Sequence, residues 1–87
     1  MILAENQVGR VIKEDNIYII SIKDRECQLD QDKWSDLISR DAIGLQYRVT
    51  GLCPHIAEVI GHTNKAIWGK LYELVRQAAN SADRLKI

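Results

Sequence analysis

Hydrophobic and polar positions alternate along the first part of the chain, and a period of two predicts β-strands. The clearest strand covers residues 17–23, which are rich in β-branched and aromatic side chains. Its apolar side chains fall on both faces, so we expect a central strand or one that a second chain covers. Residues 7–13 predict another strand, and residues 27–29 a short third one. The polar turn 14–16 would join the first two strands as a hairpin.

The pattern then changes to a helical period over residues 30–43. Trp34, Leu37 and Ile38 form an apolar stripe at helical spacing. Aspartates at the start of the segment suit an N-cap and the helix dipole. Gly44 follows, at a position where a left-handed residue commonly ends a helix. We therefore expect one helix that ends at Gly44.

Two further segments complete the pattern. Residues 45–50 alternate between apolar and polar side chains, which predicts a strand with one exposed face. After a turn that contains Pro54, residues 55–80 have a helical period with one interruption at Gly61. The tail 81–87 is expected to be frayed or to add a short turn.

These elements predict an α+β fold, in which a small N-terminal antiparallel sheet, in the order β-β-(β)-α-β, precedes a C-terminal helical hairpin. With 87 residues the chain is expected to be a single domain, 1–87. Its β-rich part with one helix is 1–50, its helical hairpin is 51–80, and the tail follows. Because the core of so small a chain is modest, we expect a homodimer in which a second copy covers the apolar strand 17–23.

The net charge of the chain says little about its binding partners, because twelve basic and twelve acidic residues cancel. Residues 1–50 carry seven basic and nine acidic side chains, and residues 51–87 carry five and three. Nucleic-acid-binding proteins usually have an excess of positive charge, so only the C-terminal part suits an anionic partner. No apolar run approaches the ~18 residues of a membrane span, and the N-terminus lacks the basic region of a signal peptide. We expect a cytoplasmic protein that does not contact a membrane.

Candidate chemistry is sparse. Cys27 and Cys53 lie far apart in the chain and are expected to be reduced, buried thiols. With His55 and His62 they supply the ligand types that zinc prefers, but they lack the paired spacing of structural zinc sites. No third group is apparent that would orient His55 as a base for Cys53. Phosphate-binding glycine loops and nucleophile elbows are also missing. We therefore expect a protein without catalytic activity, metal, cofactor or small-molecule substrate.

Residues 54–71 resemble the helix-turn-helix pattern of bacterial DNA-binding regulators. Ala57 lies where the two helices of that motif cross closely, and a small side chain is needed there. Gly61 lies where the turn requires a positive φ angle. Ile67 lies where the second helix inserts an apolar side chain into the first. The resemblance implies a small homodimeric regulator of transcription that contacts DNA.

The resemblance also implies which residues bind DNA. Asn and Lys side chains read base edges in the major groove, and further cations neutralise phosphates. The implied DNA-binding residues are Thr63, Asn64, Lys65, Trp68, Lys70, Tyr72 and Arg76. Thr63 or Asn64 would also cap the second helix.

Two alternatives stay open. The same hydrophobic spacing is typical of a plain helical hairpin packed on a sheet, and Trp68 would join the core if the helix were rotated slightly. Trp68 and Tyr72 lie four residues apart, and an exposed aromatic pair is a typical anchor for a partner protein. The second hypothesis is thus a protein-interaction module, an accessory or inhibitor protein that uses this pair or the strand 17–23. A positive ridge along residues 64–76 would favour DNA, and an apolar patch there a protein partner.

Overall fold

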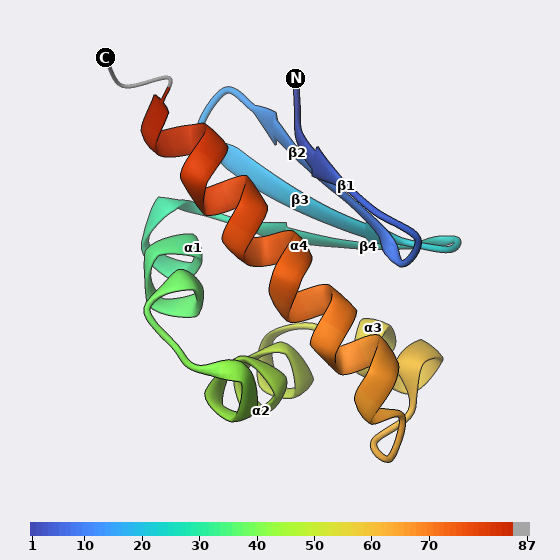
Figure 1. Cartoon of the computed structure of the whole chain (residues 1–87). Coiled ribbons are helices and arrows are strands. Elements are labelled where there is room, and N and C mark those ends of the chain that lie inside the picture. Colours follow the sequence, from blue (N-terminus) through green and yellow to red (C-terminus); the bar gives the residue numbers. More distant parts are fainter. Residues whose placement is uncertain (85–87) are drawn as a thin grey trace.

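The computed structural model describes residues 1–84 and has an α+β fold, as the sequence predicts (Figure 1). A four-stranded antiparallel sheet in the order β1-β2-β3-β4 comes first, and helices follow. The strands are β1 (Ile2–Glu5), β2 (Gly9–Glu14), β3 (Ile17–Ile22) and β4 (Arg25–Leu29). The helices are α1 (Gln31–Ile38), α2 (Ala42–Leu52), α3 (Pro54–Ile60) and α4 (Lys65–Arg84).

Tight loops join β2, β3 and β4 into a meander. Asp15 and Lys23 each begin one of these loops with a positive φ angle, 54° and 52° respectively. Few residues other than glycine adopt this conformation. β1 is a short edge strand that the sequence pattern did not predict, and its register shifts between Ile2 and Ala4. The shift interrupts the alternation of side chains, so the period of two is not visible there.

One face of the sheet carries the core, and the helices cover it. α4 packs along β1 and β2, whereas α1 and α3 contact β4 (Figure 1). Within this core the ring of Tyr18 stacks on Trp34, with 4.5 Å between the ring centroids. The largest fully buried side chains of the described residues come from both layers: Trp34, Tyr18, Ile20, Ile22, Leu29, Leu37, Leu45, Ile56, Leu71, Leu74, Val11 and Val75.

The opposite face of the sheet is not covered by any helix of the described residues (Figure 1). Ile2, Ile12 and Ile19 are cross-strand neighbours on β1, β2 and β3 and form an apolar row on this face. Ile17 lies on the same face, and it is 41% exposed, while Ile2 is 53% exposed. We call these four isoleucines the outer sheet surface. The strand predicted over residues 17–23 is therefore apolar on both faces.

The helix predicted over residues 30–43 is wrong in its extent, because α1 ends and α2 begins within this stretch. Asp41 separates the two helices and caps α2. Its carboxylate accepts a hydrogen bond from the Gly44 N–H at 2.7 Å. Gly44 consequently lies in the first turn of a helix and does not end one.

The strand predicted over residues 45–50 is wrong, because this segment belongs to α2. Leu45 and Val49 are buried and lie four residues apart, as one side of a helix requires. In a strand Tyr47 would share their face, yet it is 75% exposed. A run of six residues fits the period of a strand as well as that of a helix. The N-cap that Asp41 supplies favours the helix.

The helical segment predicted over residues 55–80, with its interruption at Gly61, is confirmed as α3, a turn and α4. α4 continues to Arg84, so most of the predicted tail is helical, and residues 85–87 lie outside the described part. No helix within residues 1–84 combines the length and the apolar character that a membrane span requires.

Cys27 and Cys53 form a disulfide bond that joins β4 to the start of α3. The prediction of reduced thiols is therefore wrong. The two cysteines are 26 residues apart in the chain, but the fold brings their Cα atoms to 5.8 Å, a separation that suits a disulfide. His55 supports the same junction, since its Nε2 lies 2.5 Å from the carbonyl oxygen of Glu26.

Candidate functional site

The turn between α3 and α4 is built around Gly61, whose φ angle is 86°. Its N–H donates to the carbonyl of Ala57 at 2.8 Å and ends α3. Asn64 then caps α4, because its side-chain oxygen accepts a hydrogen bond from the Ile67 N–H at 3.4 Å. The positive φ angle of Gly61, expected from the helix-turn-helix resemblance, is confirmed. Ala57, expected where the two helices cross closely, is buried.

Trp68 points into the protein, so the prediction that it faces DNA or a partner protein is wrong. It is 4% exposed, and its indole N–H donates to the carbonyl of Gly61 at 2.8 Å. The indole therefore packs against the inner side of the turn and satisfies a carbonyl that α3 leaves free. Ile67, expected to be the inserted apolar residue, is only partly buried.

Tyr72 and Arg76 do not form an exposed reading surface either, which corrects their predicted role. Tyr72 is partly buried against the core. The guanidinium of Arg76 lies over the Tyr72 ring, 5.7 Å from its centroid, as in a cation–π contact. The Nε and Nη2 atoms of Arg76 are buried and have no hydrogen-bond partner within the described residues. Much of this half-buried side chain thus packs against the protein and is not part of a fully exposed surface.

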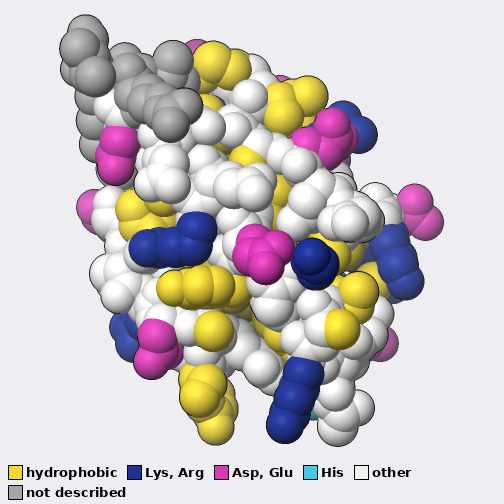
Figure 2. All heavy atoms as spheres, in the orientation of Figure 1, with side chains coloured by type: hydrophobic (Ala, Val, Ile, Leu, Met, Phe, Trp, Pro, Cys, Tyr) yellow, Lys and Arg dark blue, Asp and Glu magenta, His cyan; other side chains and the backbone are white. Residues whose placement is uncertain are grey.

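The other four predicted DNA-binding residues, Thr63, Asn64, Lys65 and Lys70, are exposed. The ammonium group of Lys70 lies 3.6 Å from the carboxylate of Glu73, which offsets its charge. On the face that α4 presents in Figure 2, basic, acidic and hydrophobic side chains are intermixed. The structure therefore shows no positive ridge along α4 in this view.

The two most exposed large hydrophobic residues of the described part lie together on α2. Tyr47 is 75% exposed and Ile43 70% exposed, one helical turn apart. A hollow of about 380 Å³ lies beside them and is also lined by Gln46, Thr50 and His62. We call these five residues the α2 surface. The sequence pattern did not reveal it, because a segment predicted as a strand gives no helical face.

The α2 surface is held in place from two sides. The side-chain amide of Gln46 donates to the carbonyl of His62 at 3.2 Å, which ties α2 to the α3–α4 turn. On the other side Asp36 of α1 accepts hydrogen bonds from Arg40 at 2.9 Å and from Arg48 of α2 at 2.6 Å. The hydrogen bond from Arg40 holds the pKa of Asp36 below its ordinary value. Loss of hydration raises this pKa, whereas the positive charges of Arg40 and Arg48 lower it further. These contacts hold α2, and with it the exposed side chains of Ile43 and Tyr47, in a fixed position.

Comparison with known protein families, with curated proteins and with solved structures finds no match to this chain. Within residues 1–84, no three histidine, cysteine, aspartate or glutamate side chains gather as they would around a metal ion. The geometry of the surfaces described above is therefore the basis for a functional proposal.

Proposed function

We propose that the protein is a small non-enzymatic interaction module that binds another protein through the α2 surface. The observation that carries this proposal is the exposure of Ile43 and Tyr47 on one side of a well-packed helix. Scattered single apolar residues are normal on a protein surface, but an adjacent aliphatic and aromatic pair beside a hollow matches the anchors of protein interfaces. The hollow would receive a side chain of the partner.

The proposal is tested by affinity capture from an extract of the cells that make the protein. The wild-type chain is compared with a Tyr47→Ser variant and with a Gln77→Ser variant, since Gln77 is an exposed residue of α4 that does not line the hollow beside Tyr47. We expect one partner to bind the wild type and Gln77→Ser, and to bind Tyr47→Ser with about 30-fold lower affinity, as the loss of a ~2 kcal/mol anchor implies. A partner that binds all three chains equally would contradict the proposal.

DNA binding is a second candidate, which the Gly61 turn and the exposed Asn64, Lys65 and Lys70 favour. The mixed charges along α4 and the inward positions of three predicted contact residues speak against it. Fluorescence anisotropy with mixed duplex DNA at low salt tests whether the protein binds DNA. Binding at a protein concentration below roughly 100 μM that is lost in a Lys65→Glu, Lys70→Glu double variant would support DNA, and no binding would exclude it.

Self-association is part of the proposal. The outer sheet surface exposes isoleucines in adjacent strands, and a second copy would cover them as the sequence predicts. The cytoplasmic location also stays a prediction, and the Cys27–Cys53 disulfide bears on it, because disulfides are rare in the cytosol. Alkylation of thiols in intact cells, followed by mass spectrometry, would show which state the protein has where it is made.

A further inference from the structure

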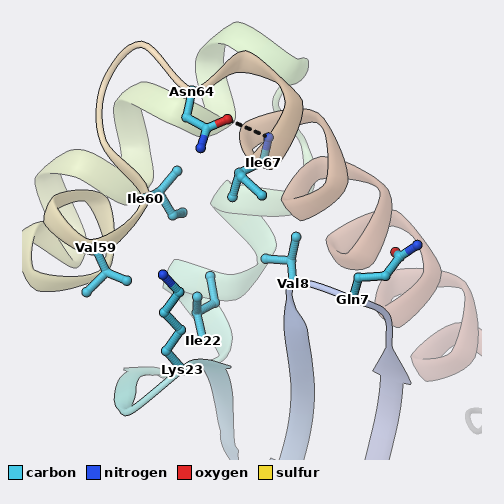
Figure 3. Close-up of a pocket in the computed structure, with 8 residues that line it drawn as sticks. All are labelled: Gln7, Val8, Ile22, Lys23, Val59, Ile60, Asn64 and Ile67. Atoms are coloured by element: carbon cyan, nitrogen blue, oxygen red, sulfur yellow. Dashed lines mark hydrogen bonds between the residues drawn. The ribbon is translucent and has the colours of Figure 1, made fainter.

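A second hollow, of about 200 Å³, lies where three loops meet at one end of the sheet (Figure 3). It is bounded by the β1–β2 loop, the β3–β4 loop and the α3–α4 turn. Its walls are aliphatic, and the side chains that form them are Val8, Ile22, Val59, Ile60 and Ile67. A cavity of ~150 Å³ lined by apolar side chains holds benzene, so this hollow has room for one short hydrocarbon chain.

Lys23 places a positive charge at this hollow. Figure 3 shows its side chain rising from the β3–β4 loop toward Ile60, with the ammonium group facing the hollow. Within residues 1–84 no carboxylate lies at ion-pair distance from it. The φ angle of Lys23 is 52°, a conformation that glycine adopts far more readily than lysine. The loop thus holds a lysine in a backbone conformation that does not favour it, beside an apolar cavity.

Asn64 supplies a second hydrogen-bond donor. Its side-chain oxygen accepts from the Ile67 N–H at 3.4 Å, which fixes the orientation of the amide. In Figure 3 the amide nitrogen consequently faces the hollow from the turn side, whereas the amide of Gln7 points away from it. Among the side chains that line the hollow, the polar groups that face it are therefore an ammonium and an amide N–H₂, which are donors.

We propose that this hollow binds a short branched aliphatic carboxylate. The carboxylate can accept hydrogen bonds from both Lys23 and Asn64, and a bond to an ammonium is stronger than one between neutral groups. The branched hydrocarbon end packs on the aliphatic walls that the two loops and the turn provide. Lys23 and Asn64 are both exposed to water, so a neutral hydrocarbon would gain no hydrogen bond from them in place of the water that they already bind. A bulky polar ligand would not fit a cavity of this size.

The test is a titration followed by two-dimensional ¹H–¹⁵N NMR, with 4-methylpentanoate as the ligand and 4-methylpentanamide as the neutral analogue. We expect saturable shifts at residues of the hollow, with a dissociation constant on the order of 1 mM, since a ligand of so few atoms binds weakly. The amide should bind at least tenfold more weakly. Absence of saturable shifts at ~10 mM, or equal binding of acid and amide, would overturn the proposal.

Two glycine variants separate ligand binding from folding. Lys23→Gly removes the ammonium and at the same time relieves the positive φ angle, so this variant should fold. It should bind 4-methylpentanoate at least tenfold more weakly than the wild type. Asp15→Gly is the matched control, because Asp15 begins the β2–β3 loop with a φ angle of 54° at the other end of the sheet. The control should bind as the wild type does, and unchanged binding by Lys23→Gly would refute the role of the lysine.

Discussion

Gly61 lies just before α4 and Gly69 lies inside it. Only the backbone conformation at Gly61 requires a glycine. Gly61 has φ 86° and ψ 140°, a region that is essentially restricted to glycine. Gly69 is exposed within α4, just after its first turn, and a Cβ atom added there would meet nothing within 4 Å. Substitution by alanine should therefore change stability in opposite directions at the two positions.

We predict that Gly61→Ala lowers the free energy of unfolding by about 1–3 kcal/mol, the range for strained backbone conformations. Gly69→Ala should raise it by up to about 1 kcal/mol, because alanine has a higher helix propensity. Urea denaturation of the two variants and the wild type measures both changes. A stabilised Gly61→Ala variant would show that α3 and α4 form one continuous helix.

Asp36 should make stability depend on pH. Its pKa in the folded protein lies below the ordinary value of 3.8, chiefly because of the hydrogen bond from Arg40. A carboxyl group with a lowered folded pKa stabilises the fold above its unfolded pKa, and this stabilisation is lost as the pH falls through the folded pKa. Asp36→Asn should therefore melt at a lower temperature than the wild type at pH 7, with the difference shrinking below about pH 4. A difference that is constant between pH 7 and pH 2 would contradict this origin.

At the scale of secondary-structure elements, the sequence pattern was reliable where it was long or unambiguous. Ile17 to Ile22 formed the predicted strand, and Gly61 interrupted the helical segment because its position requires a positive φ angle. The pattern failed for residues 45–50, where Leu45, Tyr47 and Val49 satisfy a period of two by coincidence. The capping hydrogen bond of Asp41, which starts that helix, depends on local geometry that a hydrophobicity pattern does not contain.

The candidate sites were harder to predict than the elements for the same reason. Trp68 and Tyr72 share one side of a helix, but the sequence does not say how far that helix is rotated against the sheet. The Trp68 indole N–H donates a hydrogen bond to the carbonyl of Gly61 in the turn. This bond depends on the three-dimensional shape of the turn, which the spacing of residues along the sequence does not give. The α2 surface and the hollow at Lys23 arise from contacts between segments far apart in the chain.

The assignment of α2 as a helix can be tested through stability. Leu45→Ala should lower the free energy of unfolding by about 2–5 kcal/mol, since Leu45 is fully buried. Tyr47→Ser should change it by less than about 0.5 kcal/mol, because the side chain is exposed. In a strand both residues would lie on the same face and both variants would be strongly destabilised. Chemical denaturation of the two variants distinguishes these outcomes.

At the scale of the whole molecule, the disulfide connects the sheet to the helical layer. Cross-linking Cys27 to Cys53 closes a chain segment with a sequence separation of 26, and the chain-entropy model gives about 3–4 kcal/mol for a loop of this length. We predict that reductant lowers the melting temperature of the wild type but leaves that of a Cys27→Ala, Cys53→Ala variant unchanged. Calorimetry with and without reductant measures this, and coincident melts of the wild type would mean that the thiols are not joined.

The outer sheet surface bears on the assembly of the whole molecule. Strand spacing of ~4.8 Å and a rise of ~3.3 Å per residue make the face of this sheet roughly 20 Å by 20 Å. This is small beside the ~800 Å² that each partner buries in a standard interface, so a dimer through this face should be weak and concentration-dependent. Arg10, Ile12 and Glu14 follow one another along this face of β2. A twofold axis across the strands at Ile12 would place Arg10 of one copy opposite Glu14 of the other.

We predict that the wild type forms dimers that dissociate on dilution through the micromolar range, and that Ile19→Lys is monomeric throughout. Ile19 lies in the apolar row beside Ile12, and a lysine there would place two like charges in the interface, whereas the core on the other face would be untouched. Ile43→Lys is the control, because it changes a more exposed isoleucine on α2 and should leave the dimer intact. Sedimentation velocity over a concentration series measures all three. If Ile43→Lys and not Ile19→Lys abolished the dimer, self-association would belong to the α2 surface, and the partner proposed for that surface would be a second copy of this chain.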